Sequence, residues 1–284
     1  MMKLHKFVRL NNPVIQGLFY LIVLQLIGLQ LACKSETTQP PARPRTVHKG
    51  SVTVGVFRPE ITAFLLRNSN TAGNQDMGLT YGIIGDIYLA GDWNGDGTDT
   101  IGVYRPDINT FLLINKNANG DPDMIVPFGS PGDIPVVGDW DGDGTTTIGV
   151  FRPGDATFYL RNSNTEGSPE VAVLFGAKGD IPLAGDWDGD GVDTIGVYRP
   201  VITAFLLRNS NSPGDPDLAA TYGTAGDIPV VGDWDGDGTT TIGVFRPGHS
   251  SFLLRNSNTN GNQDITVTYG TTGDIPVVGD WDGK

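Results

Sequence analysis

Four short acidic segments recur in the sequence and carry its clearest potential for chemistry. Three read Asp-Trp-Asp-Gly-Asp-Gly, and the fourth is the variant Asp-Trp-Asn-Gly-Asp-Gly. Oxygen donors at alternate positions 1, 3 and 5, before a glycine that permits a sharp turn, can surround one hard cation such as calcium. The backbone carbonyl at position 7 can add a ligand. The candidate ligands are Asp92, Asn94, Asp96, Thr98, Asp139, Asp141, Asp143, Thr145, Asp186, Asp188, Asp190, Val192, Asp233, Asp235, Asp237 and Thr239.

Electrostatic repulsion within each segment favours a bound ion. Three carboxylates within about 4–5 Å repel one another by roughly 3–4 kcal/mol per pair at an effective dielectric constant of 20. The alternative is a set of solvated, metal-free Asp-Gly turns, and four copies in register weaken it. Position 9 is threonine in every copy, so the ligand set lacks a further acid. An EF-hand is excluded because position 12 is valine and the flanking sequence resembles strands.

A fifth copy of the segment is incomplete. It contains Asp280 and Asp282, but Lys284 stands where the third acid belongs, and Lys49 occupies the matching place before the first unit. An ammonium group at this position would neutralise the two remaining carboxylates. We therefore expect about four calcium ions, with the fifth loop non-binding.

The acidic segments belong to a longer repeat that must position them. Asp-Trp and Arg-Pro pairs each recur every 47 residues, and residues 50–284 form five consecutive units without an insertion. Short apolar runs within each unit are separated by Gly, Pro, Asn and Asp, which is typical of strands and turns. In the third unit these runs are Ile134–Gly138, Thr146–Phe151, Thr157–Arg161 and Val171–Phe175.

Four short strands in a repeat of this length predict a β-propeller blade. An open β-solenoid and a string of small β-domains are the alternatives, but a separate 47-residue β-domain without disulfides would bury too little surface to fold alone. The repeats begin just before a second strand (Ser51–Phe57) and stop just after a first strand (Ile275–Gly279). We expect an all-β, five-bladed propeller over residues 51–284, closed when the C-terminal strand joins the N-terminal blade. A monomer is expected, and a ring completed by oligomerisation is the alternative.

Other repeated side chains have two interpretations each. The five tryptophans can form a sugar-stacking ring, but packing between blades is favoured. The arginines of the Arg-Pro pairs can bind an anionic ligand, but pairing with the aspartates of the Gly-Asp-Ile segments is favoured. Asn-Ser-Asn turns are expected to be solvated. These arginines and aspartates are Arg58, Arg105, Arg152, Arg199, Arg246, Asp86, Asp133, Asp180, Asp227 and Asp274.

The first 50 residues are expected to direct export. Residues 1–33 begin with basic side chains, continue through the apolar run Leu18–Ala32 and end at Cys33, which is typical of a signal peptide. This segment resembles a bacterial lipoprotein signal, in which Cys33 would be lipidated, although Gln30 stands where such signals usually have leucine. An uncleaved anchor and simple secretion are the alternatives.

Residues 34–50 are predicted to be a flexible tether. The protein is therefore expected outside the cytoplasm, with membrane contact only through its N-terminal lipid or anchor.

The composition and the similarity of the repeats exclude several classes of function. A net charge of −13 argues against a nucleic-acid partner. One cysteine excludes an intramolecular disulfide and a cysteine-cluster zinc site. An active site needs distinct residues in distinct roles, which five near-identical units do not offer, so we expect no enzyme. Binding of a glycan or protein at a surface remains, with a structural spacer and, more remotely, a hydrolase with its site in the propeller channel as alternatives.

The units GDWDGDGTTTIGVFRP and GDWDGDGVDTIGVYRP resemble the FG-GAP or VCBS repeats of bacterial surface proteins. They are also similar to the calcium-binding blades of integrin α-subunit propellers. The resemblance covers residues 51–284 and implies a propeller, calcium in the loop between the first and second strands, and extracellular adhesion or recognition. The repeat length and count are also similar to those of five-bladed sugar-binding lectins, whose sequence motif is absent here.

Overall fold

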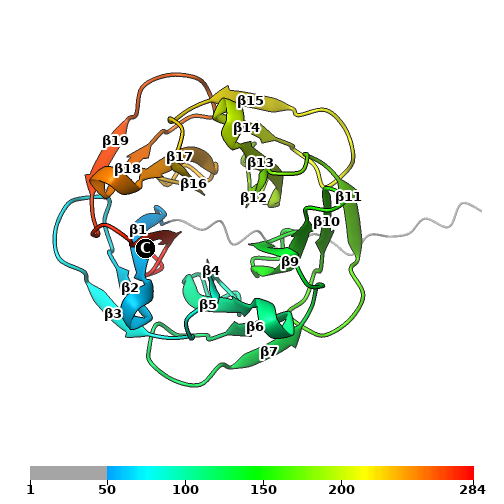
Figure 1. Ribbon diagram of the computed structural model, residues 1–284, viewed down its shortest axis with the longest axis horizontal. Helices are drawn as coiled ribbons and strands as arrows, with labels where there is room; N and C mark the ends of the chain where they lie inside the picture. Colours follow the sequence, from blue (N-terminus) through cyan, green and yellow to red (C-terminus); the bar gives the residue numbers. More distant parts are fainter. Residues whose placement is uncertain (1–49) are drawn as a thin grey trace, which may run out of the picture. The chain divides into compact units, whose positions relative to one another are not determined.

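A computed structural model describes residues 50–284. The predicted signal segment, Cys33, Lys49 and all but the last residue of the predicted tether lie outside the described residues. Five four-stranded antiparallel sheets form a ring, so the described part is the five-bladed β-propeller that the sequence predicts (Figure 1). Among the described residues, no helix has the length and apolar character needed to cross a membrane.

Each blade runs from an innermost strand at the axis to an outer edge strand. The strands, blade by blade and from the inside outward, are as follows. Blade 1 contains β20 (Ile275–Gly279), β1 (Thr53–Arg58), β2 (Ala63–Leu66) and β3 (Met77–Thr80). Blade 2 contains β4 (Ile87–Gly91), β5 (Thr100–Arg105), β6 (Thr110–Leu113) and β7 (Met124–Pro127). Blade 3 contains β8 (Ile134–Gly138), β9 (Thr147–Arg152), β10 (Thr157–Leu160) and β11 (Val171–Leu174). Blade 4 contains β12 (Ile181–Gly185), β13 (Thr194–Arg199), β14 (Ala204–Leu207) and β15 (Leu218–Thr221). Blade 5 contains β16 (Ile228–Gly232), β17 (Thr241–Arg246), β18 (Ser251–Leu254) and β19 (Ile265–Thr268).

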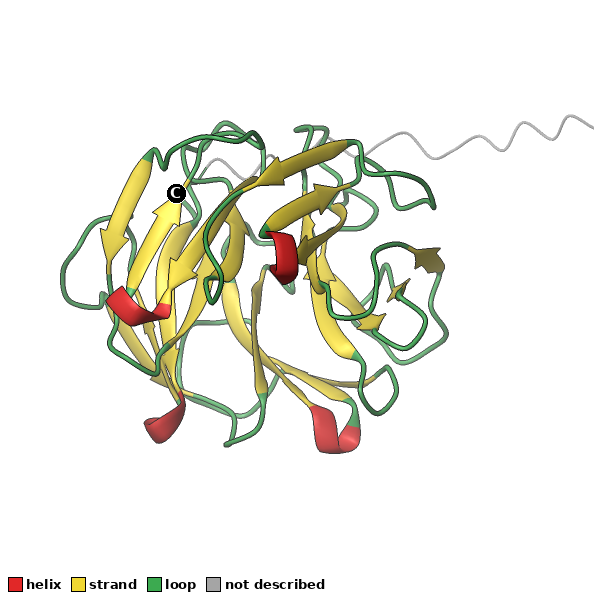
Figure 2. Cartoon of the chain, turned by 45° about the horizontal axis from the view of Figure 1, so that its top comes forward, coloured by secondary structure: helices red, strands yellow, loops and turns green. Residues whose placement is uncertain are grey.

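Four blades also contain a single turn of 3-10 helix between their second and third strands (Figure 2). A proline opens each of these turns, because its fixed φ suits the first helical position and its missing N–H needs no partner there. The turns are η1 (Pro59–Ile61), η2 (Pro106–Ile108), η3 (Pro200–Ile202) and η4 (Pro247–His249).

The ring closes by the predicted strand exchange. Strand β20 pairs antiparallel with β1, from Thr53 opposite Gly279 to Phe57 opposite Ile275. One blade is thus built from one strand of the C-terminal end and three strands of the N-terminal end. This pairing leaves no exposed inner edge at the seam, where an unpaired strand would invite aggregation.

The hydrophobic core lies between blades rather than within them. Trp281 and Phe57 of blade 1, for example, belong to one buried cluster with Ile101 and Val103 of blade 2. All five tryptophans are at most 5% exposed. Packing between blades is therefore confirmed for the tryptophans, and an exposed tryptophan ring for sugar stacking is not formed.

The repeated Arg-Pro arginines pair with the Gly-Asp-Ile aspartates, as expected. In blade 2, Arg105 donates from Nε and Nη2 to the two carboxylate oxygens of Asp86, at 2.9 and 2.8 Å. The same two-point contact joins the corresponding residues in the other four blades. Each pair ties the end of a second strand to the turn before the innermost strand.

The expectation that the Asn-Ser-Asn turns are simply solvated is wrong for their second asparagine. Asn70 donates from Nδ2 to the carbonyl oxygen of Val52 at 2.8 Å, and its own Oδ1 accepts from the backbone N–H of Val54. The preceding arginine, Arg67, is buried and donates to Ser69 and Thr71 in the same turn. These turns are thus fastened to the segment that follows each acidic loop.

Candidate metal centre

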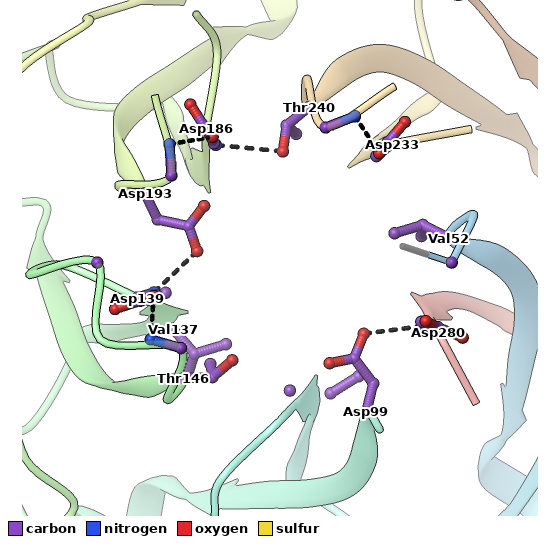
Figure 3. A pocket seen from close by; sticks show the side chains of 18 residues that line it. Val52, Asp99, Val137, Asp139, Thr146, Asp186, Asp193, Asp233, Thr240 and Asp280 are labelled. Atoms are coloured by element: carbon purple, nitrogen blue, oxygen red, sulfur yellow. Dashed lines mark hydrogen bonds between the residues drawn. The ribbon is translucent and has the colours of Figure 1, made fainter. Parts of the chain in front are cut away.

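The acidic loops connect the innermost strand of each blade to the second strand. They surround a central cavity of about 220 Å³, which residues from all five blades line (Figure 3). Because the innermost strands surround the axis, the first aspartates of four neighbouring loops line one cavity: Asp139, Asp186, Asp233 and Asp280. The propeller therefore brings the sequence-predicted ligand sets together at one end of the central channel.

The first aspartate of each loop shapes the turn. Both carboxylate oxygens of Asp92 accept backbone hydrogen bonds, from Gly95 and Gly97 at 2.7 Å each. In the next loop, Asp139 accepts in the same way from Asp143 and Gly144, at 3.0 and 2.8 Å. The glycine at position 6 is required because its φ is positive, for example +91° at Gly144.

Three loops bring three carboxylates together. In each of these loops, one oxygen from every acid lies within 4.8 Å of one from the other two. Calcium–oxygen distances are about 2.3–2.6 Å, so ligand oxygens on opposite sides of one calcium ion lie roughly 5 Å apart. The donor set thus fits one hard cation per loop. The three sets are Asp139, Asp141 and Asp143; Asp186, Asp188 and Asp190; and Asp233, Asp235 and Asp237.

The electrostatic state of these loops favours a cation. Burial and, to a smaller extent, the neighbouring acids raise the pKa of Asp139 to about 6, although the backbone N–H groups of Gly144 and Asp143 lower it. Burial likewise raises the pKa of Asp186 and Asp233. Within the described residues, no lysine or arginine forms an ion pair with the Asp139 loop. Negative charge in this loop is costly without a counter-ion.

The Asp92 loop differs from the other three. Its Asn94 donates from Nδ2 to a carboxylate oxygen of Asp96 at 3.0 Å, so an amide of the protein already contacts the third position. The loop has two carboxylates instead of three, and therefore less repulsion for an ion to relieve. A fourth ion at this loop stays a prediction, as do the carbonyl ligands at position 7.

In the incomplete fifth loop, the ammonium group of Lys284 contacts one of the two acids. Lys284 Nζ lies 3.4 Å from Asp282 Oδ2, as the sequence suggested for an ammonium group in that place. The first aspartate, Asp280, keeps its structural role and accepts the backbone N–H of Gly283 at 3.0 Å. The turn can thus form when the third acid is absent.

Position 8 of four loops has a role that the sequence did not reveal. Thr146 donates its backbone N–H to the carbonyl oxygen of Asp92 in the preceding blade, at 2.7 Å. Its hydroxyl oxygen accepts the backbone N–H of the same Asp92, at 3.0 Å. Asp193 holds Asp139 in this way, and Asp99 holds Asp280 across the closing seam (Figure 3). The sequence feature that could have indicated this role is that position 8 is always Asp or Thr in four units.

Position 9 is also structural. The hydroxyl of Thr147 donates to the carbonyl oxygen of Gly138 at 3.1 Å, and both residues are buried. Thr194 and Thr241 make the equivalent bond in their blades. A threonine at this position fastens the base of the loop across the two strands, which explains why no acid occurs there.

Comparisons with known proteins add little to this geometry. No protein-family model matches the chain, and no curated protein matches it. Among solved structures, one similar chain comes from a study of how an Agrocybe aegerita lectin recognises non-reducing terminal N-acetylglucosamine. It shares 16% sequence identity at a TM-score of 0.42, over 69% of this chain and 58% of that chain. The present chain thus spans little more than half of that lectin chain.

Proposed function

We propose that this protein is a non-catalytic, extracellular, calcium-binding propeller that recognises a glycan or protein ligand at a surface. The observation that carries the proposal is the set of three carboxylate triplets, each with oxygens within 4.8 Å, whose first aspartates line one cavity. Calcium would hold each triplet, and thereby the turn and the contact to the next blade. A purely structural spacer is the second candidate.

Calcium would act as a structural clamp on the ring. Position 8 of one blade bonds to both backbone groups of the first aspartate in the preceding loop, for example Asp193 with Asp139. An ion that fixes Asp139 therefore also fixes the junction between blades 3 and 4. A site with a dissociation constant near 0.1 mM, within the range of extracellular modules, would contribute about 1.4 kcal/mol at millimolar calcium.

A non-catalytic role is supported by how the repeated polar residues are used. The recurring acids, arginines and threonines form the loops, the ion pairs and the strand contacts described above. The single histidine of the repeats, His249, lies in η4 and has no equivalent in the other units. Near-equivalent blades instead suit repeated, multivalent binding, in which several weak contacts add up to firm attachment.

The test is calcium titration calorimetry of the purified protein, combined with thermal melting in calcium and in EDTA. We expect saturable heat and a higher melting temperature in calcium. In the variant Asp141→Ala, the melting temperature in calcium should be lower than that of the wild type by about 3–5 °C, because one complete site is lost. Its melting temperature in EDTA should be unchanged or slightly raised, because a repelling charge is removed.

Asp107→Ala is the matched control, since Asp107 is an exposed acid on η2, outside the loops. It should behave as the wild type in both buffers. Equal losses for Asp141→Ala in calcium and in EDTA would show that Asp141 serves only the turn. Absence of any calorimetric signal would remove calcium from the proposal.

A further inference from the structure

One junction between blades departs from the repeat on both of its sides. Tyr159 of β10 stands where the other four units have leucine. Glu166, in the loop between β10 and β11, stands where the second and fifth units have asparagine. Pro127 ends the facing edge strand β7, where three other units have threonine. All three departures lie around the space between blades 2 and 3.

In two other junctions, the asparagine equivalent to Glu166 latches neighbouring blades together. Asn119 Oδ1 accepts the backbone N–H of Thr80 at 2.9 Å, which joins blade 2 to blade 1. Asn260 accepts from Thr221 at 2.7 Å between blades 5 and 4. Pro127 has no N–H, so this latch cannot form between blades 2 and 3.

A groove lies at this junction. Its volume is about 640 Å³, against about 440 Å³ for the equivalent hollow around Arg105 between blades 1 and 2. We call it the 2/3 groove, and its lining includes Phe128, Val150, Arg152, Tyr159, Glu166 and Ser168. This volume lies within the range of small-molecule sites, roughly 300–1,000 Å³.

The 2/3 groove combines apolar surface with a fixed polar group. Phe128 and Val150 in its lining are almost fully buried, so the half-buried Tyr159 offers most of the accessible apolar surface. Arg152 is held by both oxygens of Asp133, at 2.9 and 2.8 Å, and its Cζ lies 4.5 Å from the centre of the Tyr159 ring. The guanidinium is thus immobilised and its charge is balanced, which limits the entropy lost when a ligand binds.

The rim supplies hydrogen-bond donors and acceptors together. Glu166 is an acceptor, the hydroxyl of Ser168 is both, and the amide of Asn109 on the facing blade is both. An anion would need donors alone, and the carboxylate of Glu166 and the protein's net charge of −13 oppose it. A cation would need acceptors alone. A neutral ring with several hydroxyls, each of which donates and accepts, matches this mixture.

We propose that the 2/3 groove binds one neutral sugar residue of a glycan, whose apolar C–H face packs on the accessible part of Tyr159 while its hydroxyls meet the rim. The proposal rests on the surface-recognition function above and specifies where, and for which ligand chemistry, that recognition occurs. It makes Tyr159 the residue that distinguishes this groove from its four equivalents.

The test begins with the purified protein on an array of neutral, sialylated and sulfated glycans, followed by calorimetry with the best neutral binder. Tyr159→Leu and Glu166→Asn each install the residue that other units carry, so the fold should be preserved, and melting curves check this. We expect each variant to weaken binding by about tenfold. The control Glu60→Asn removes an exposed acid from η1 and should bind as the wild type does.

Each of the following outcomes would contradict the proposal that this groove binds a neutral sugar. Failure to bind any neutral glycan, or preference for sialylated or sulfated ones, overturns the ligand class. Neutral binding that survives Tyr159→Leu in a folded variant places recognition elsewhere and overturns the site. A peptide or protein that binds through Tyr159 while glycans do not also overturns the proposal. These results are separable from the calcium test, because a glycan signal lost with Tyr159→Leu stands whether or not calcium heat is observed.

Discussion

Two sets of aspartates recur in every blade, and they differ in the groups that contact their carboxylates. The Gly-Asp-Ile aspartates lie against arginine, and although burial alone would raise the pKa of Asp227, its contacts with Arg246 bring it below the ordinary value. The first aspartates of the acidic loops are supported mainly by backbone N–H groups. Burial there raises the pKa of Asp139 to about 6. At Asp139 the backbone donors thus do not offset burial, whereas at Asp227 the arginine together with Thr224 does.

The comparison teaches which acids are available for chemistry. A carboxylate whose charge is already balanced within the protein has little to gain from a metal ion. The loop triplets have no such arginine, so under our proposal they are the acids that would bind a cation from solution. Position alone would not separate the two sets, because both lie next to the innermost strand.

The largest effect is expected when an arginine of the balanced set is removed. Arg246→Met leaves Asp227, which is 8% exposed, without its partner, and we expect a loss of about 3 kcal/mol in the free energy of unfolding. Urea denaturation in calcium and in EDTA measures it, and the loss should be the same in both. Adding Asp227→Asn should restore part of the stability. A loss that appears only in calcium would contradict the division into two sets.

An intermediate effect is expected from pH, with opposite signs for the two sets. Because Asp139 binds its proton more tightly in the folded state, the metal-free protein should gain stability as pH falls from about 7.5 to about 5. Asp227 and Asp274 have lowered pKa values, so their contribution is present above the unfolded pKa of about 4 and is lost as the pH falls below it.

Melting curves measured in EDTA across this range should therefore rise by about 2 °C toward pH 5 and then decline in more acidic buffer. With calcium present the rise should vanish, because the metal binds the deprotonated acids. A steady decline from neutral pH in EDTA would show that the loop acids are not strained by their charge.

The smallest effect is expected at the loop that already has a cation. Lys284→Ala removes an exposed ion pair with Asp282, and the free energy of unfolding should change by no more than about 0.5 kcal/mol. Calorimetry should show the same number of calcium ions bound as in the wild type, because only two acids remain. An additional bound ion in this variant would mean that two acids are enough for a site, which would also favour occupancy of the Asp92 loop.

The sequence predicted the architecture well because the repeat supplies five aligned observations of each strand. The boundaries expected for the third unit differ from β8 to β11 by at most one residue at either end. The closure through β20 was also predicted, since the unit boundaries at the two ends are complementary. The proline-initiated turns such as η1 were missed, because three residues show no helical period.

Several hydrogen bonds between side chains and distant backbone groups could not be predicted from the repeat. Thr146 bonds to Asp92 across 54 positions, and Asn70 reaches back 18 positions to Val52. In the sequence, these residues have the appearance of ordinary turn residues. The 2/3 groove was missed for a related reason: Pro127 and Glu166 matter only because they face each other, and their distance along the chain conceals this.

The pairing of β20 with β1 also has a consequence for biosynthesis. Thr53 and Gly279 are 226 residues apart, so the inner edge of β1 emerges long before its partner is made. At about 5–20 residues per second, the ribosome needs on the order of 10–45 s to reach β20. During that interval the other four blades can assemble, but β1 keeps an unpaired edge, which is a site for pairing with another chain. The closed ring therefore cannot form until β20 has been synthesised.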